Sequence, residues 1–116
     1  MRLSFGNDDL GRLVCTFHDG TGVTTACAAD GPIAIAALRE ALDALDRHGE
    51  AECFWLVSAG EYRWVFKRIG GKLRLAVLWC ASVAIGFQHV AWAEDEFDSF
   101  TTMMRGELAR YAVTVR

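Results

Sequence analysis

The 116-residue chain lacks a long uncharged apolar stretch, although 53% of its residues are hydrophobic. It contains no apolar run of about 18 residues, the length that a membrane-spanning helix requires. Its first residues, MRLSFGNDDLG, become polar before the apolar region of an export signal could form. We therefore expect a cytoplasmic protein with no membrane partner, and the length predicts one domain over residues 1–116.

Clustered cysteines are also lacking, because Cys15, Cys27, Cys53 and Cys80 are widely spaced and form no C-x-x-C motif. Each lies in a segment that is typical of a strand. In a cytoplasmic chain this pattern indicates reduced core thiols rather than disulfides or a metal site.

Catalytic motifs are lacking too. Ser58, Ser82 and Ser99 have no G-x-S-x-G context. His18 and Asp19 would point to opposite faces of a strand, and we expect capping or core roles for His48 and His89. The glycine pairs are turn signals rather than phosphate loops. We therefore expect no catalytic, cofactor-binding or metal-binding residues, and a protein that is not an enzyme.

What the sequence does contain is a long predicted β-hairpin from Glu61 to Trp79, centred on Gly70-Gly71. Two glycines suit a type I′ turn, in which both central residues need a positive φ. With Ile69 opposite Lys72, counting outward places one set of pairs on the buried face and another on the polar face. The buried pairs are Tyr62 with Trp79, Trp64 with Val77 and Phe66 with Leu75; the others are Arg63 with Leu78, Val65 with Ala76 and Lys67 with Arg74.

Two helices are predicted on either side of the strands. The first follows the cap Asp30, runs to about His48 and buries Ile35, Leu38, Leu42 and Leu45. The second begins at Glu94-Asp95-Glu96, whose carboxylates suit a helix N-terminus, and buries Phe97, Phe100, Met104, Leu108 and Tyr111.

Further strands are predicted over residues 2–6, 12–18, 23–28, 52–58 and 87–92, while the pattern leaves open whether residues 80–92 form one strand or two. Strand 52–58 is apolar on both phases, which predicts a place near the middle of the sheet. The sequence thus predicts an α+β fold with the order β-β-β-α-β-β-β-β-α. We expect one antiparallel sheet of about six or seven strands with the helices packed on one face.

Charge is unevenly distributed along the chain, whose net charge is −3. The hairpin region is basic, and Lys67 opposite Arg74 is an unfavourable like-charge pair unless an acidic neighbour or a partner compensates it. Two surfaces are therefore candidates for binding a partner: an acidic one and, as the alternative, a basic one. The first consists of Glu94, Asp95, Glu96 and Asp98, and the second of Arg63, Lys67, Lys72 and Arg74. Nucleic acid is not expected, because the pI is near 5.5 and the hairpin aromatics share the buried face.

The segment Gly60-Glu61-Tyr62-Arg63-Trp64 and the closing run Leu75–Trp79 resemble a group of small bacterial proteins that share a GEYRW-type hairpin after a Leu/Ala-rich helix. Small acidic proteins of this type are similar to immunity proteins of bacterial toxin systems, including contact-dependent growth inhibition. The resemblance implies a non-enzymatic protein that binds and neutralises a cognate toxin domain, with a nuclease as one case. Two alternatives stay open: a small ligand-binding or enzymatic domain with a pocket between sheet and helices, and a self-associating structural subunit.

Overall fold

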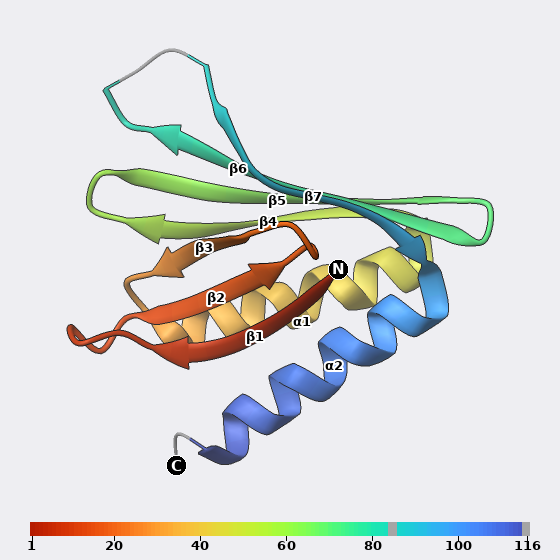
Figure 1. The fold of residues 1–116 in the computed structure, drawn as a ribbon, viewed down its shortest axis with the longest axis horizontal. Coiled ribbons are helices and arrows are strands. Elements are labelled where there is room, and N and C mark those ends of the chain that lie inside the picture. The colour runs from red at the N-terminus through yellow and green to blue at the C-terminus, as the bar shows by residue number, and fades with distance from the viewer. Residues whose placement is uncertain (84–85, 115–116) are drawn as a thin grey trace.

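The computed structural model describes residues 1–83 and 86–114, with side chains described up to residue 112. The chain order of its elements matches the predicted order (Figure 1). The elements are β1 (Arg2–Asn7), β2 (Leu13–His18), β3 (Val23–Ala28), α1 (Gly31–His48), β4 (Glu50–Val57), β5 (Gly60–Ile69), β6 (Lys72–Ala81), β7 (Gln88–Glu96) and α2 (Phe97–Thr114). Residues 80–92 therefore contribute to two strands, although residues 84–85 lie outside the described part. No helix of that part is long and apolar enough to cross a membrane.

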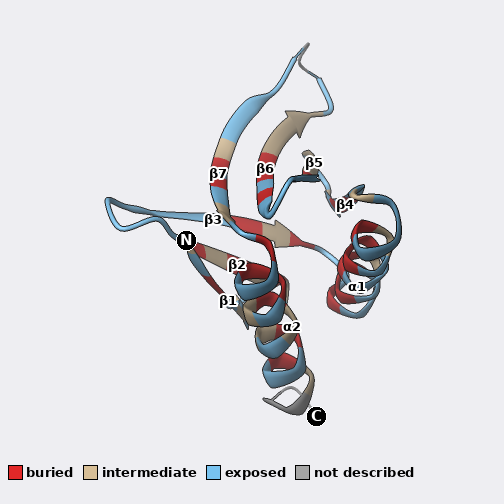
Figure 2. Ribbon diagram, turned by 90° about the vertical axis from the view of Figure 1, so that its right-hand side faces the viewer, coloured by how far each residue is buried: buried red, intermediate tan, exposed pale blue. Residues whose placement is uncertain are grey.

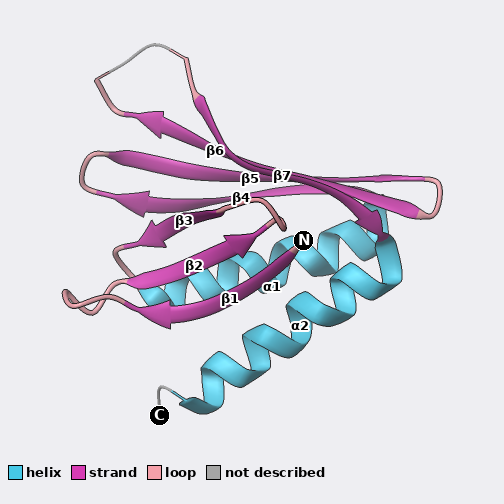
Figure 3. Ribbon diagram, viewed as in Figure 1, coloured by secondary structure: helices cyan, strands magenta, loops and turns pink. Residues whose placement is uncertain are grey.

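The strands form two antiparallel sheets, with the orders β1-β2-β3 and β4-β5-β6-β7 (Figure 3). The prediction of a single sheet is therefore wrong. Strands β3 and β4 lie side by side and run in the same direction, as expected for strands joined through a helix (Figure 1). Within the described residues, the one backbone hydrogen bond between them lies at their C-terminal ends, where Ala29 N donates to the carbonyl oxygen of Leu56 at 2.9 Å. Strand β4 is therefore the edge of its sheet and not a central strand as predicted.

The core lies between the inner faces of the sheets and the two helices. Trp64 is fully buried on β5, where its ring lies 4.8 Å from that of Trp55 on β4 and 5.3 Å from that of Phe17 on β2. One side chain thus joins both sheets. Two of its neighbours in sequence, Tyr62 and Phe66, lie on the same face, and Phe66 is also buried.

The predicted helix stripes are confirmed, since every residue of both is buried. The Asp30 side chain caps α1 by accepting from Ile33 N at 3.0 Å, and Gly49 ends that helix with a φ of 77°. The predicted start of the second helix is wrong. Strand β7 continues to Glu96, and α2 begins at Phe97, because the alternation of outward and inward side chains persists through Glu94 and Asp95.

The central hairpin has the predicted register at every pair from Tyr62 opposite Trp79 to Ile69 opposite Lys72. Its turn differs from the prediction. Gly70 has a φ of 61°, whereas Gly71 has no positive φ. A positive φ at the first central residue alone is typical of a type II′ turn rather than type I′.

The four cysteines lie on strands, as predicted, and all are free thiols in the structure. Cys15 and Cys53 are buried, whereas Cys27 and Cys80 are half-buried. Burial raises the pKa of Cys15 well above its usual value. Burial, assisted by the charge of Glu52, raises the pKa of Cys53 to about 12.

The turn geometry predicts opposite effects for two neighbouring substitutions. Gly70→Ala should lower the free energy of unfolding by about 1 kcal/mol, because an L residue is strained at this positive φ. Gly71→Ala should be neutral or stabilising by up to about 1 kcal/mol, since it restricts the unfolded chain without meeting any neighbour. Urea unfolding of both variants measures this. An equal loss of unfolding free energy in both variants would instead support the type I′ turn.

The cysteines should react with iodoacetamide in two groups. The thiolate is the reactive form, and at pH 8 only about one in ten thousand Cys53 thiols is ionised if its pKa is about 12. In the native protein we expect Cys27 and Cys80 to be alkylated first, and Cys15 and Cys53 only after denaturation. Peptide mass mapping over time identifies the order. A disulfide found without reductant, or early modification of Cys53, would contradict the predicted core.

Candidate protein-binding surface

The face of the four-stranded sheet turned away from the helices, called the outer face below, carries exposed apolar side chains. Figure 2 shows both helices lying to the other side of β4–β7. Phe54 and Leu56 on β4 are 41% and 63% exposed, and Trp92 on β7 is 56% exposed. Half-buried Val65 and Leu78 lie on the strands between them. The sequence prediction missed this surface, because the two apolar phases of β4 indicated a strand covered on both sides.

A row of charges crosses the same face, one residue from each strand. Glu50, Lys67, Arg74 and Glu94 are successive cross-strand partners on β4, β5, β6 and β7. The Arg74 Nε donates to the Glu94 Oε2 at 2.7 Å. The predicted like-charge pair therefore has an acidic neighbour on each side, which offsets its repulsion within the fold.

The structure separates the four residues of the predicted acidic surface. Glu94 and Glu96 lie on the outer face of β7, where they are the cross-strand partners of Arg74 and Lys72. Asp95 has the opposite orientation, and its Oδ2 is 3.1 Å from the amino group of Met1. Asp98 lies in the first turn of α2. The acidic surface is therefore not one patch.

The four residues of the alternative, basic surface do share one face. Arg63, Lys67, Lys72 and Arg74 all lie on the outer face of β5 and β6, interleaved with the acidic residues of β4 and β7. The outer face thus combines apolar residues at one end with alternating charges at the other. It is suited to a protein partner more than to a ligand of one charge sign.

Arg63 lies against the apolar part of this face. Its guanidinium carbon is 5.1 Å from the centre of the Phe54 ring, and an Arg63 nitrogen is 3.9 Å from the Glu61 carboxylate. The Arg63 Nε and the Glu61 Oε2 are buried, and neither has a hydrogen-bond partner within the described residues. Buried polar atoms without hydrogen-bond partners cost free energy, and the contact between the two opposite charges offsets part of this cost.

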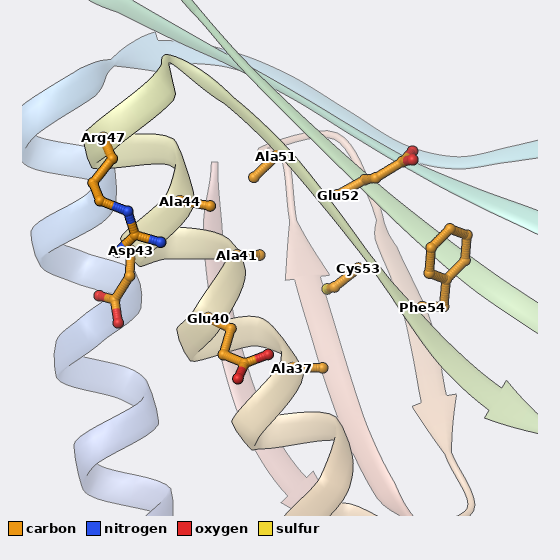
Figure 4. A pocket seen from close by; sticks show the side chains of 10 residues that line it. All are labelled: Ala37, Glu40, Ala41, Asp43, Ala44, Arg47, Ala51, Glu52, Cys53 and Phe54. Atoms are coloured by element: carbon orange, nitrogen blue, oxygen red, sulfur yellow. The ribbon is translucent and has the colours of Figure 1, made fainter.

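An open groove with a volume of about 730 Å³ runs along the surface between α1 and the edge strand β4, which pack on each other beneath it (Figure 4). Ala37, Ala41 and Ala44 of α1 point toward β4, while Ala51 and Cys53 point toward the helix. Glu52 and Phe54 point away from α1, onto the outer face. This groove is the place that corresponds to the predicted pocket between sheet and helices.

The GEYRW segment has structural roles that the geometry explains. A Cβ on Gly60 would lie 2.2 Å from the carbonyl oxygen of Cys80, so no side chain fits there. Tyr62 packs on Trp79 with 4.8 Å between the ring centres, and Trp64 forms the core contact described above.

The histidines do not form a site. His18 and His89 are both exposed, so the predicted core role of His89 is wrong, while His48 lies in the last turn of α1 as predicted. Within the described residues, no group of three or more His, Cys, Asp or Glu side chains could hold a metal ion.

The charge row predicts measurable coupling between two of its members. In a double-mutant cycle, Arg74→Ala and Glu94→Ala should couple by about 0.2–1 kcal/mol in the free energy of unfolding at low salt. The control pair is Lys72 with Glu96, which are cross-strand partners but form no ion pair in the described structure. Its coupling should be near zero, and a larger coupling in the control pair would contradict the geometry.

Comparison of the chain with protein-family models, with curated proteins and with solved structures found no match. The outer face and the α1–β4 groove are the features from which a function can be proposed.

Proposed function

We propose that the protein is a non-enzymatic immunity protein that binds and neutralises a cognate toxin domain. The observation that carries this proposal is the outer face, where Phe54, Leu56 and Trp92 remain exposed on a sheet whose other face buries Trp64, Phe66 and Leu75 in the core. The resemblance of the GEYRW segment to a group of small bacterial proteins supports the same function, since small acidic proteins of this type are similar to immunity proteins.

The residue types of the outer face favour a protein partner. Tryptophan, phenylalanine and arginine are enriched at the centres of protein interfaces, where they contribute most of the binding energy. Trp92, Phe54 and Arg63 supply these three types, and the charged row beside them resembles the polar rim of such an interface.

The charge of the chain favours a basic toxin. Glu50 and Glu52 form no ion pair in the described structure and lie beside the apolar part of the outer face. Nuclease toxins need a basic surface to bind phosphate, and an acidic inhibitor accelerates encounter with such a surface. A nuclease is therefore the toxin activity that we propose to test first.

The alternatives make different predictions. A ligand-binding domain should retain or bind a small molecule in the α1–β4 groove, and a self-associating subunit should form oligomers through the outer face. Native mass spectrometry of the purified protein distinguishes these cases, because a retained ligand or an oligomer has a different mass from the free monomer that the proposed function predicts.

The binding test uses the purified product of the neighbouring gene as the candidate toxin. Trp92→Ala should weaken the complex by at least about 30-fold, as expected for an exposed aromatic that becomes central on binding. Leu10→Ala is the matched control, because Leu10 is 77% exposed in the β1–β2 turn, away from the outer face. Surface plasmon resonance measures both, and thermal melts verify that folding is unchanged.

The acidic residues of β7 can be tested in the same assay. Glu94→Lys with Glu96→Lys should slow association at low salt, because rim charges act chiefly on the encounter rate. Wild-type binding and full protection of toxin-exposed cells by both the Trp92 and the Glu94/Glu96 variants would remove the outer face from the interface. Failure to form any complex with the neighbouring product, together with a retained small molecule, would favour the ligand-binding alternative.

A further inference from the structure

The open edge of β4 faces a groove rather than another strand. On one side β4 pairs with β5 along its whole length; on the other it receives only the hydrogen bond from Ala29 N to the Leu56 oxygen within the described residues. Residues 51–54 line the groove beside α1, and on this side they have no strand partner in the described structure (Figure 4). Unpaired strand edges are templates for the addition of another strand.

The backbone orientation along this edge follows from that single bond. In an antiparallel pair, the N–H and C=O of one residue point to the same side, and the side alternates along the strand. Because the Leu56 carbonyl points away from β5, the backbone groups of Glu50, Glu52 and Phe54 point away from β5 as well. These groups accept and donate no hydrogen bond elsewhere in the described structure. The closing pair of the β4–β5 hairpin, Val57 with Gly60, agrees with this alternation.

The lining of the groove restricts the occupant. On the α1 side the small side chains of Ala37, Ala41 and Ala44 point toward β4, and the charged residues Glu40, Asp43 and Arg47 also line the groove. A strand paired with β4 would direct every second side chain toward these alanines and the others onto the outer face beside Glu50 and Glu52. The occupant therefore needs small or apolar residues at one phase and cations at the other.

We infer that the α1–β4 groove binds an extended basic segment of a partner protein, which adds to the sheet as an antiparallel strand beside Glu50, Glu52 and Phe54. Its small residues contact the alanines of α1, and its Lys or Arg residues face the two unpaired carboxylates. Backbone hydrogen bonds provide affinity and the alternating pockets provide specificity, as in other strand-addition complexes.

Charge argues against a second copy of this chain as the occupant. An antiparallel pair of two β4 edges would bring Glu50 and Glu52 of one copy close to the same carboxylates of the other. Like charges across strands are destabilising, whereas Lys or Arg opposite these positions is favourable. Of the charged residues that line the groove, Glu40 and Glu52 form no ion pair in the described structure, Asp43 pairs with Arg105, and Arg47 is the one cation, so the lining is acidic on balance.

The inference extends the proposed function, and the inferred site shares Glu50, Glu52 and Phe54 with the outer face. Residues that belong to one site alone, Ala44 in the groove and Trp92 on the outer face, separate the failure of one proposal from the failure of the other. Trp92→Ala should leave binding at the groove unchanged while weakening binding at the outer face.

The test uses a synthetic nine-residue peptide, KVKAKVKAK, and the full-length protein labelled with ¹⁵N. Addition as a strand should shift the amide signals of Glu50, Glu52 and Phe54 and slow their hydrogen exchange. Two N-methylated versions of this peptide, which carry the same side-chain charges, show whether binding depends on backbone hydrogen bonds or on charge alone. N-methylation of the Lys backbone nitrogens, which would face β4, should abolish binding, whereas N-methylation of the Val and Ala nitrogens should not.

Two protein variants test the walls of the groove. Ala44→Leu fills the groove and should weaken peptide binding at least about tenfold, whereas Ala36→Leu makes the same change on α1 outside the groove and should have no effect. Glu50→Gln with Glu52→Gln should also weaken binding. Equal binding of the two methylated peptides, or no shift at these three amides at millimolar peptide, would overturn the inference. Dimerisation through β4 without peptide would instead show that a second copy occupies the edge.

Discussion

The aromatic contact around Trp64 is the interaction on which the rest of the structure depends. The ring lies on β5, yet it touches Trp55 of β4 and Phe17 of β2, so it connects the two sheets where their backbones do not pair. Its indole Nε1 and that of Trp55 are buried without a hydrogen-bond partner in the described structure. Burial of two large rings compensates this cost, because each removes far more apolar surface from water than its single polar atom requires.

This arrangement also determines which surfaces remain free. Because the inner faces of both sheets and the stripes of both helices meet in one core, the apolar side chains of the opposite face of β4–β7 receive no cover. The same crossover through α1 brings β3 against the C-terminal end of β4 and leaves the N-terminal part of β4 open. The same topology thus leaves both the outer face and the groove uncovered, and Glu52 and Phe54 contribute to both.

Periodicity made much of this fold predictable. The alternation on either side of Gly70-Gly71 specified every pair of the central hairpin, and the helix stripes were equally clear. The turn type was not predictable, because two adjacent glycines permit a positive φ at either position. The division into two sheets depends on pairing between strands far apart in sequence, which leaves no local pattern. Likewise Glu94 and Glu96 suited a helix start as well as the end of a strand, and only tertiary contacts decide between them. The apolar residues of the outer face were visible in the sequence, but a strand apolar on both phases does not reveal which side lacks a neighbour.

The contrast between the two sheet junctions has a consequence for folding kinetics. Strands β4, β5 and β6 are joined by two-residue connections, so their contacts close short loops and cost little chain entropy to form. The β3–β4 junction has one backbone hydrogen bond in the part of the chain that the structure describes and requires α1 to be in place, so it closes a much longer loop. We expect the β4–β6 hairpins to form early and the joining of the two sheets around Trp64 to be the late, rate-limiting event.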